Sequence, residues 1–390
     1  MYLSREQEKM LNGEYGWVYA RALEVIVKVG ESLGAEKLVP IVHAHISGVS
    51  YTNIGEPGLG FIKDFYSKGA RVRVYSTINP GCIDLAGSSQ VISSSFREKQ
   101  LEINMYLEKM GFEKTFTCIP YLHRKPGINE HLAWGESSAV IFANSIFGAR
   151  TNREGGPLAL AAALTGYTYY WGLHILDNRV VSTKIDVSSI RGEYYGALGL
   201  WLGEHIREIP MLTGISGRLD LLKILLAASA ASGDHGLIVL ENITPEKTYL
   251  VNDKIETVFV DENEIEEYIG SMPSRKDKIL GYIGCPHLDP YEFEKLVEII
   301  SKNDKGVGDN LLLVSIPYIY MEVFKDEIGF LKSRGVDIVV GTCPIVSKLS
   351  REFDYLVTNS GKAVFYMSRL HKLNTYITSF ERTVDLVYGG

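Results

Sequence analysis

The sequence predicts an α/β fold with mostly parallel sheets, divided among more than one domain. In the last third of the chain, apolar runs alternate with segments of helical periodicity, a pattern typical of parallel strands joined by helices. The runs are residues 279–283, 311–317, 336–340 and 353–357, and the helical segments between them include 291–301 and 318–333. The 390 residues, 46% hydrophobic and 22% charged, provide enough apolar material for a large core. Ligands bind beyond the carboxyl ends of such strands, so we expect the site there.

Turns with glycine and polar residues follow these C-terminal strands. Residues 279–283 lead into Gly284-Cys285-Pro286, and residues 336–340 lead into Gly341-Thr342-Cys343. Residues 353–357 lead into a turn that contains Lys362. Because the carboxyl ends of parallel strands share one edge of a sheet, we expect two thiols and an ammonium group to converge there.

Two strand ends in the N-terminal region also carry polar residues. Residues 38–46 are expected to form a strand that ends in Ser47-Gly48-Val49-Ser50, where hydroxyls and free backbone N–H groups suit a carboxylate or phosphate. The strand expected over 71–77 leads to Asn79 and Pro80, and the Asn79 amide either orients a substrate oxygen or bonds its own turn. An ordinary serine and glycine turn is the competing interpretation of 47–50. Helices are expected over 4–36, 55–68, 95–110 and 219–231, and shorter β-like runs over 115–122 and 236–240.

Residues 131–165 hold the densest mixture of polar and small residues. Unpaired polar groups are costly in a core, so this composition indicates a lined cavity or a hydrogen-bond network. Glu136 and Ser137 precede an apolar run and mark a helix start, whose N–H groups would face an anion. Structural capping explains Glu136 and Ser137 equally well from the residues alone.

Composition shifts suggest three regions, with charged residues 252–276 at the last boundary. The regions are an N-terminal α/β domain over 1–130, a central α/β region with a polar, small-residue cavity lining over 131–275, and a C-terminal α/β domain over 276–390 that carries Cys285, Cys343 and Lys362.

Charge and hydropathy argue against nucleic-acid and membrane partners. The net charge of -7, with no basic block, argues against nucleic acid as the main partner. No apolar stretch approaches the roughly 18 residues that span a bilayer, and the N-terminal MYLSREQEKM is charged rather than signal-like. These features predict a cytoplasmic protein without a membrane partner. His174, His205 and His235 lack metal-binding spacing and are expected to be structural.

Four cysteines, Cys82, Cys118, Cys285 and Cys343, are too few and too scattered for a disulfide framework. A single free cysteine is most often a buried small hydrophobe, and a nucleophilic site needs only one. Cys118, Cys285 and Cys343 stand in turns close to prolines, without the C-x-x-C pairs of structural zinc sites. Three isolated thiolates fit a 4Fe–4S cluster with one iron left open as a Lewis acid. Spacing alone leaves these interpretations open.

Several separate motifs occur in a characteristic order along most of the chain. They are HISGVSYTNIG at 45–55, FTCIPYL at 116–122, WGESSAVIFANSIFGARTNREGGP at 134–157, GCPH at 284–287, GTCP at 341–344 and TNSGKA at 358–363. With these motifs the sequence resembles the aconitase X family. Bacterial members are often longer fused chains that act on cis-3-hydroxy-L-proline, whereas archaeal members are split into a large subunit and a small swivelling subunit. This sequence ends at Gly390 without an extra swivel domain, so the archaeal-type large subunit is the closer likeness.

The resemblance implies an aconitase-like large subunit that removes water from (R)-5-phosphomevalonate and yields trans-anhydromevalonate 5-phosphate, in a modified mevalonate pathway to isoprenoids. It implies a 4Fe–4S cluster held by Cys118, Cys285 and Cys343, and a heterodimer with a small swivel-domain subunit. The substrate-binding positions carried over by the resemblance are Gly48, Val49, Ser50, Asn79, Pro80, Glu136, Ser137 and Lys362. Glu136 and Ser137 are also the catalytic candidates. Cys82 lies outside the motifs and is interpreted as a turn residue.

For some of these residues the resemblance leaves more than one role open. Glu136 would act as a general acid or base or would position Ser137, and Lys362 would bind an anionic end of the substrate. By analogy with aconitase, a serine of the small subunit is the expected proton acceptor, which would leave the large subunit inactive alone. Two other functions remain: a cis-3-hydroxy-L-proline dehydratase of the same family, and a non-catalytic scaffold that binds a cluster or zinc. A scaffold gains nothing from polar residues that line a cavity.

Overall fold

The strands of the protein form four sheets in a computed structural model that describes residues 1–87, 92–347 and 352–389. The described strands are β1 Leu38–Pro40, β2 His43–Ile46, β3 Tyr75–Ile78, β4 Leu132–Trp134, β5 Tyr167–Tyr169, β6 Val180–Asp186, β7 Ile209–Thr213, β8 Val239–Leu240, β9 Leu250–Phe259, β10 Ile279–Ile283, β11 Leu311–Ile316, β12 Val336–Val340, β13 Tyr355–Thr358 and β14 Asn374–Ile377. The described α-helices are α1 Arg5–Leu11, α2 Trp17–Ser32, α3 Tyr51–Ser67, α4 Ser94–Met110, α5 Ser137–Ile146, α6 Gly156–Thr165, α7 Tyr195–His205, α8 Leu219–Ser232, α9 Glu266–Ile269, α10 Pro290–Ser301, α11 Tyr320–Val323, α12 Lys325–Ser333, α13 Gly361–His371 and α14 Phe380–Tyr388.

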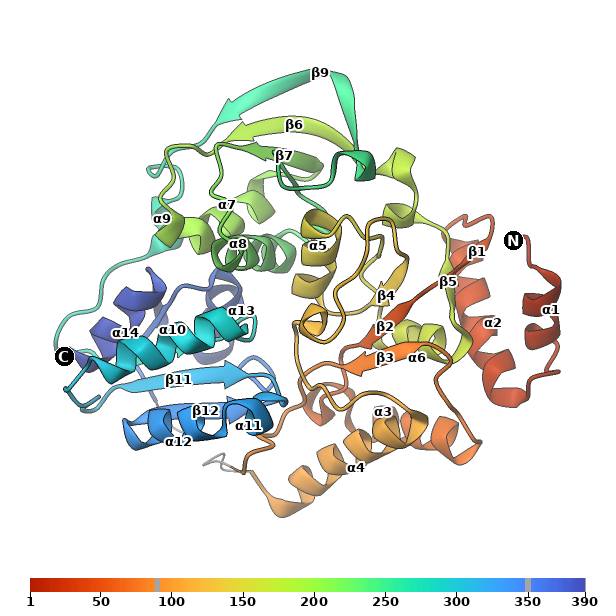
Figure 1. The fold of residues 1–390 in the computed structure, drawn as a ribbon, viewed down its shortest axis with the longest axis horizontal. Helices are drawn as coiled ribbons and strands as arrows, with labels where there is room; N and C mark the ends of the chain where they lie inside the picture. Colours follow the sequence, from red (N-terminus) through yellow and green to blue (C-terminus); the bar gives the residue numbers. More distant parts are fainter. Residues whose placement is uncertain (88–91, 348–351, 390) are drawn as a thin grey trace.

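Parallel pairing dominates, as the sequence predicts. The sheets β3-β2-β4, β8-β7-β6-β9 and β12-β11-β10-β13-β14 contain parallel pairs throughout, and β1 with β5 forms a separate antiparallel pair. Figure 1 shows the five-stranded sheet with helices on both faces, to one side of the N-terminal sheet. The α/β fold class is therefore confirmed.

The C-terminal sheet follows the apolar runs closely. Strands β10 and β12 have the predicted bounds, 279–283 and 336–340, because each run is buried on both faces of a parallel sheet. The helix expected over 318–333 is instead two helices, α11 and α12. They are separated at Phe324, whose backbone angles of φ -123° and ψ 37° are not helical.

The N-terminal region departs from the expected continuous elements. The strand predicted over 38–46 is divided into β1 and β2, which join different sheets. Between them, Ile41 N–H donates to Gly166 and Val42 N–H to His131, so the chain changes pairing partners. The helix expected from Gly55 begins earlier, at Tyr51, and Gly55 kinks it with φ 53°. No strand forms over 115–122, where Pro120–Leu122 is a single 3-10 turn.

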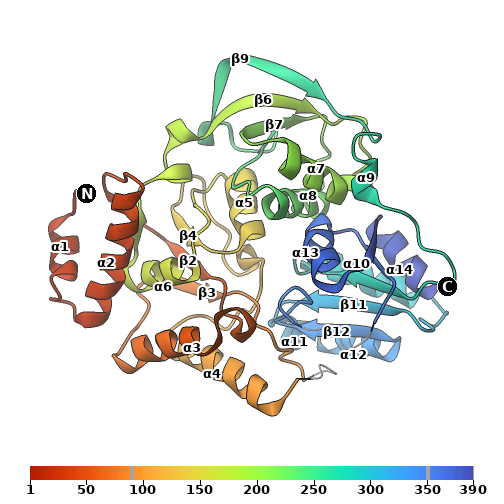
Figure 2. The same ribbon diagram turned by 180° about the vertical axis from the view of Figure 1, so that it is seen from behind.

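Two glycines allow the middle and C-terminal parts of the chain to approach closely. A Cβ atom on Gly361 would lie 2.1 Å from the Gly196 carbonyl oxygen, and one on Gly196 would lie 2.6 Å from the Asn359 carbonyl oxygen. Helix α13 therefore packs against α7 and α8, as Figure 2 shows from behind. This contact fixes the turn from which Lys362 projects.

Within the described residues, no helix is both long enough and apolar enough to cross a membrane.

Candidate functional site

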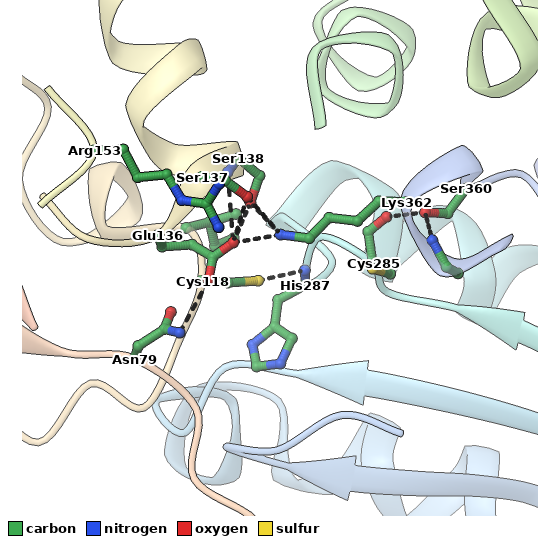
Figure 3. Close-up of polar contacts among 12 residues, drawn as sticks. Asn79, Cys118, Glu136, Ser137, Ser138, Arg153, Cys285, His287, Ser360 and Lys362 are labelled. Atoms are coloured by element: carbon green, nitrogen blue, oxygen red, sulfur yellow. Dashed lines mark hydrogen bonds and ion pairs between the residues drawn. The ribbon is translucent and has the colours of Figure 1, made fainter. Parts of the chain in front are cut away.

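A cavity of about 240 Å³ lies where the turns after several strands converge. Its lining residues follow β2, β3, β4, β10, β12 and β13, so the carboxyl ends of strands from two parallel sheets contribute to it. Small-molecule pockets for larger ligands typically occupy about 300–1,000 Å³, so the volume indicates a small metabolite. Figure 3 shows the polar side chains at its centre.

Most of the predicted site residues line this one cavity. They are Gly48, Ser50, Asn79, Pro80, Cys118, Glu136, Ser137, Cys285, Cys343 and Lys362. Val49 does not line it: its side chain is buried in the N-terminal core, and its carbonyl accepts a hydrogen bond from Gln100 at 3.1 Å. If Val49 contacts a ligand, it must do so through its backbone.

The centre of the cavity is a buried ion pair between Glu136 and Lys362. The Lys362 ammonium contacts Glu136 Oε1 and also donates to Ser137 Oγ at 3.4 Å and Ser138 Oγ at 3.3 Å. The second carboxylate oxygen, Oε2, accepts from the Asn79 amide at 3.0 Å. Each of the three ammonium hydrogens therefore has a protein oxygen to face, and both carboxylate oxygens accept hydrogen bonds (Figure 3).

Electrostatics hold both partners in their charged forms. Burial alone would favour a neutral Glu136, but the Lys362 ammonium and the Asn79 amide outweigh it and lower the pKa of Glu136 to about 2. Burial likewise disfavours the charged Lys362, yet the adjacent carboxylate raises its pKa above the ordinary value. Glu136 is thus a carboxylate at neutral pH, which suits holding Lys362 and the neighbouring serines better than donating a proton.

Three cysteines reach the cavity from three different turns. Cys118 precedes the 3-10 turn at Pro120–Leu122, Cys285 follows β10 and Cys343 follows β12. Cys118 Sγ accepts a hydrogen bond from the His287 N–H at 3.2 Å. Burial raises the pKa of all three thiols, that of Cys285 to about 12. Cys82 does not line this cavity, and its thiol donates to Gln100 at 3.0 Å.

The thiol arrangement bears on which metal group fits. In residues 1–87, 92–347 and 352–389, no three His, Cys, Asp or Glu side chains gather closely enough to hold one metal ion. An iron–sulfur cluster binds each cysteine through a different iron, which needs thiols around one cavity but not around one point. Cys118, Cys285 and Cys343 satisfy that weaker requirement.

The turn that begins helix α3 places the Ser50 hydroxyl at the cavity. Ser50 is its N-cap, but the side chain makes no capping bond. Its Oγ is buried without a partner among the described residues, although Ser50 lines the cavity. The Tyr51 N–H already donates to Gln100 Oε1 at 2.7 Å, and the Asn53 and Ile54 N–H groups donate to the Ser50 carbonyl at 2.9 and 3.1 Å. A buried unpaired hydroxyl is costly unless a ligand binds there, so the Ser50 side chain is the group of this turn that is suited to meet a ligand.

Other lining or contacting residues were not among the predicted ones. Arg153 and Tyr366 line the cavity, and Ser138 donates to Glu136 Oε1 at 3.1 Å. Arg153 belongs to the polar stretch of the sequence, but its place at the cavity depends on a bridge to Trp134 that the sequence does not reveal. Its guanidinium is half-exposed and donates to Asp234 at 2.6 Å.

Three other hollows are larger, at about 310, 360 and 440 Å³. None of the three contains a predicted site residue, so the chemistry of the lining, and not size, selects the candidate site.

The three histidines expected to be structural each have a partner away from this cavity. His174 Nδ1 lies 2.9 Å from His131 Nδ1, and His205 bonds the Trp201 carbonyl at 3.0 Å. His235 lies 2.6 Å from Ser229 Oγ.

Comparisons with known proteins agree along the whole chain. Family models match residues 1–177 as aconitase X first domain, 179–270 as second domain and 279–389 as third domain. The chain is 41% identical over 387 residues to a phosphomevalonate dehydratase large subunit from Methanocaldococcus jannaschii, which covers 94% of this chain and 95% of that relative. It is 28% identical to a cis-3-hydroxy-L-proline dehydratase from Hypocrea jecorina, over 100% of this chain and 69% of that relative. A crystal structure of Thermococcus kodakaraensis aconitase X in its holo-form has a TM-score of 0.89 and 34% identity, covering 99% of this chain and 100% of that chain.

Together, the fold, the cavity and these relatives define an enzyme that eliminates water, a hydro-lyase. The chain belongs to the aconitase X family. Residues from the first and third family domains build the cavity together.

Proposed function

We propose that this chain is the large subunit of a heterodimer that dehydrates (R)-5-phosphomevalonate to trans-anhydromevalonate 5-phosphate in a mevalonate pathway. The observation that carries the proposal is the convergence of Cys118, Cys285 and Cys343 with the Glu136–Lys362 pair around one cavity. The name of the M. jannaschii relative supports the substrate and, through the words large subunit, a smaller partner.

Cys118, Cys285 and Cys343 would hold a 4Fe–4S cluster. When bound, the cluster supplies a Lewis acid that makes the tertiary hydroxyl of the substrate a better leaving group. The reaction breaks one C–O bond and one C–H bond on adjacent carbons and releases water, so no electrons are gained or lost.

The protein residues bind and orient the substrate. The substrate carries a carboxylate and a phosphate, and the cavity offers separate donors for them: the Ser50 hydroxyl at the start of α3, and Arg153 at the mouth. Lys362 is engaged by Glu136, so we assign it to fixing Ser137 and Ser138 and to balancing charge at the centre. We assign Glu136 the role of positioning Ser137 and Lys362, because its carboxylate is saturated with donors.

The proton acceptor is proposed to lie on the small subunit. Among the residues that line the cavity, Glu136 is the carboxylate, and its pKa of about 2 makes it a weak base. A serine of the partner, as in the analogy with aconitase, would complete the site.

An anaerobic assay tests the proposal. The chain is reconstituted with iron and sulfide, mixed with its small subunit, and offered phosphomevalonate and cis-3-hydroxy-L-proline in parallel, with products followed by mass spectrometry. We expect loss of one water from phosphomevalonate alone, and no turnover without the small subunit. Turnover of hydroxyproline alone would change the substrate, and no turnover of either by the reconstituted complex would indicate a scaffold.

A further inference from the structure

A line of buried hydrogen bonds runs from strand β2 to the Glu136 carboxylate. His43 Nε2 lies 2.8 Å from Thr77 Oγ1, and the same hydroxyl lies 2.8 Å from His45 Nδ1. His45 Nε2 lies 3.2 Å from Asn79 Oδ1, and the Asn79 amide donates to Glu136 Oε2 at 3.0 Å. The two histidines and Thr77 are fully buried, so water does not compete for these bonds.

The donor and the acceptor of each hydrogen bond in this line can be assigned by starting from the Glu136 carboxylate. An ionised carboxylate only accepts hydrogen bonds, so the Asn79 atom that faces it is the NH₂ group, and Oδ1 faces His45. Oδ1 also only accepts, so His45 Nε2 must carry a proton.

The histidine tautomers follow in turn. Burial lowers the pKa of His45 to about 4 and that of His43 well below its ordinary value, so both rings are neutral and each has one N–H. His45 Nδ1 therefore accepts from the Thr77 hydroxyl, and that hydroxyl accepts from His43 Nε2–H. His43 Nδ1 ends the line and is buried without a partner among the described residues, and the His43 ring contacts the Tyr75 and Trp134 rings.

We propose that His45 is a positioning residue for the dehydration: its Nε2–H fixes the orientation of the Asn79 amide, and Asn79 thereby holds Glu136 beside Lys362. This inference rests on the proposed function, in which Glu136 positions the centre of the site. Without the His45 donor, Asn79 keeps its bond to Glu136 Oε2 but loses the second bond that fixes the amide. The Asn79 amide, and the carboxylate that it holds beside Lys362, would then be less well positioned.

Kinetics of the reconstituted complex with its small subunit test the role. His45→Leu removes both ring nitrogens, whereas His45→Gln can place an N–H near the position of Nε2. We expect His45→Leu to lower kcat at least about tenfold, with a smaller change in KM, as is typical for residues that orient a reactive group. His45→Gln should restore most of the rate. His235→Gln, which alters another buried histidine with a hydroxyl partner, is the matched control and should keep the wild-type kcat.

Melting temperatures and near-ultraviolet circular dichroism spectra show whether the His45 variants fold like the wild type. A wild-type kcat in His45→Leu, or a His45→Gln variant as slow as His45→Leu, would overturn the proposal.

A spectroscopic measurement tests the bond direction without turnover. In a chain labelled with ¹⁵N-histidine, NMR should show His43 and His45 as neutral Nε2–H tautomers at pH 7. Thr77→Val, which removes the donor to His45 Nδ1 but leaves Asn79 Oδ1 as the acceptor, should change the His45 Nδ1 signal while Nε2 stays protonated. A His45 found as the Nδ1–H tautomer in the wild type would refute the inference. If the wild-type complex fails to dehydrate phosphomevalonate, the proposed function fails, and this measurement still decides whether the line has the stated direction.

Discussion

Lys362 and Glu136 are in contact although 226 residues separate them in the chain. Glu136 stands at the start of α5 in the first family domain, and Lys362 stands in the first turn of α13 in the third. The Ser360 side chain caps α13 and also donates to the Cys285 carbonyl. The ion pair therefore joins two domains at the point where a cysteine turn is anchored.

Breaking this ion pair should reduce stability and activity together. Lys362→Met leaves the Glu136 carboxylate buried without its cation, which typically costs about 3–5 kcal/mol of unfolding free energy. Urea denaturation at pH 7 measures the loss, and we expect no detectable turnover in the dehydration assay.

A double variant separates the two effects. Lys362→Met with Glu136→Gln removes the uncompensated charge and should regain much of the lost stability, but not the activity. Equal unfolding free energies for the single and double variants would contradict the charge argument.

The three cavity cysteines should differ from the fourth in iron binding. Cys118→Ser, Cys285→Ser and Cys343→Ser should each bind less iron and sulfide after anaerobic reconstitution, with weaker visible absorption, because a hydroxyl is a poor ligand for iron in such clusters. Cys82→Ser is the matched control, since Cys82 is buried against Gln100 and does not line the cavity. Full iron content in any of the three cavity variants would remove that cysteine from the proposed ligand set.

Local sequence patterns predicted the positions of some residues that line the candidate site. Apolar runs that end in glycine placed Cys285 and Cys343 at strand ends, because a buried parallel strand leaves a clear mark in the sequence. Much of the fold was predictable for the same reason.

Features that depend on contacts between distant segments could not be predicted from the residues alone. The pairing of Lys362 with Glu136 requires two domains to meet, and the division of 38–46 into β1 and β2 depends on partners at 131 and 166. The Val49 side chain is buried in the N-terminal core, so the predicted contact of this residue with a ligand is left to its backbone N–H. Arg153 belongs to a polar stretch in which the sequence does not distinguish one residue from another. Its position at the cavity depends on the β-bridge between Trp134 and Arg153.

Arg153 should contribute to substrate binding. Arg153→Met removes a cation at the mouth of the cavity, and a hydrogen bond to a charged group contributes about 1.5–3 kcal/mol when it is well formed. Because the guanidinium is half-exposed, we expect the lower end of this range, a rise of about tenfold in KM for phosphomevalonate with little change in kcat. Asp234→Asn, which removes the exposed partner but keeps the arginine, should leave KM unchanged or lower it. An unchanged KM in Arg153→Met would exclude Arg153 from the anion sites.

Glu154 should make the stability of the protein depend on pH. The carboxyl is buried, accepts hydrogen bonds at 3.1 Å from the Thr168 and Tyr169 hydroxyls, and has its pKa raised by burial to about 7. The native state therefore holds this proton more tightly than the unfolded chain, whose pKa for glutamate is 4.5. The resulting stabilisation is fully present below about pH 4.5 and is lost as the pH rises through about 7. At about 1.4 kcal/mol per pKa unit, the free energy of unfolding should fall by an amount on the order of 3 kcal/mol across this range.

Glu154→Gln keeps a hydrogen-bonding side chain of the same shape but cannot ionise. Urea denaturation from pH 4.5 to 8 should show the wild type losing stability relative to Glu154→Gln across this window, and parallel curves for the two proteins would show that Glu154 does not titrate there.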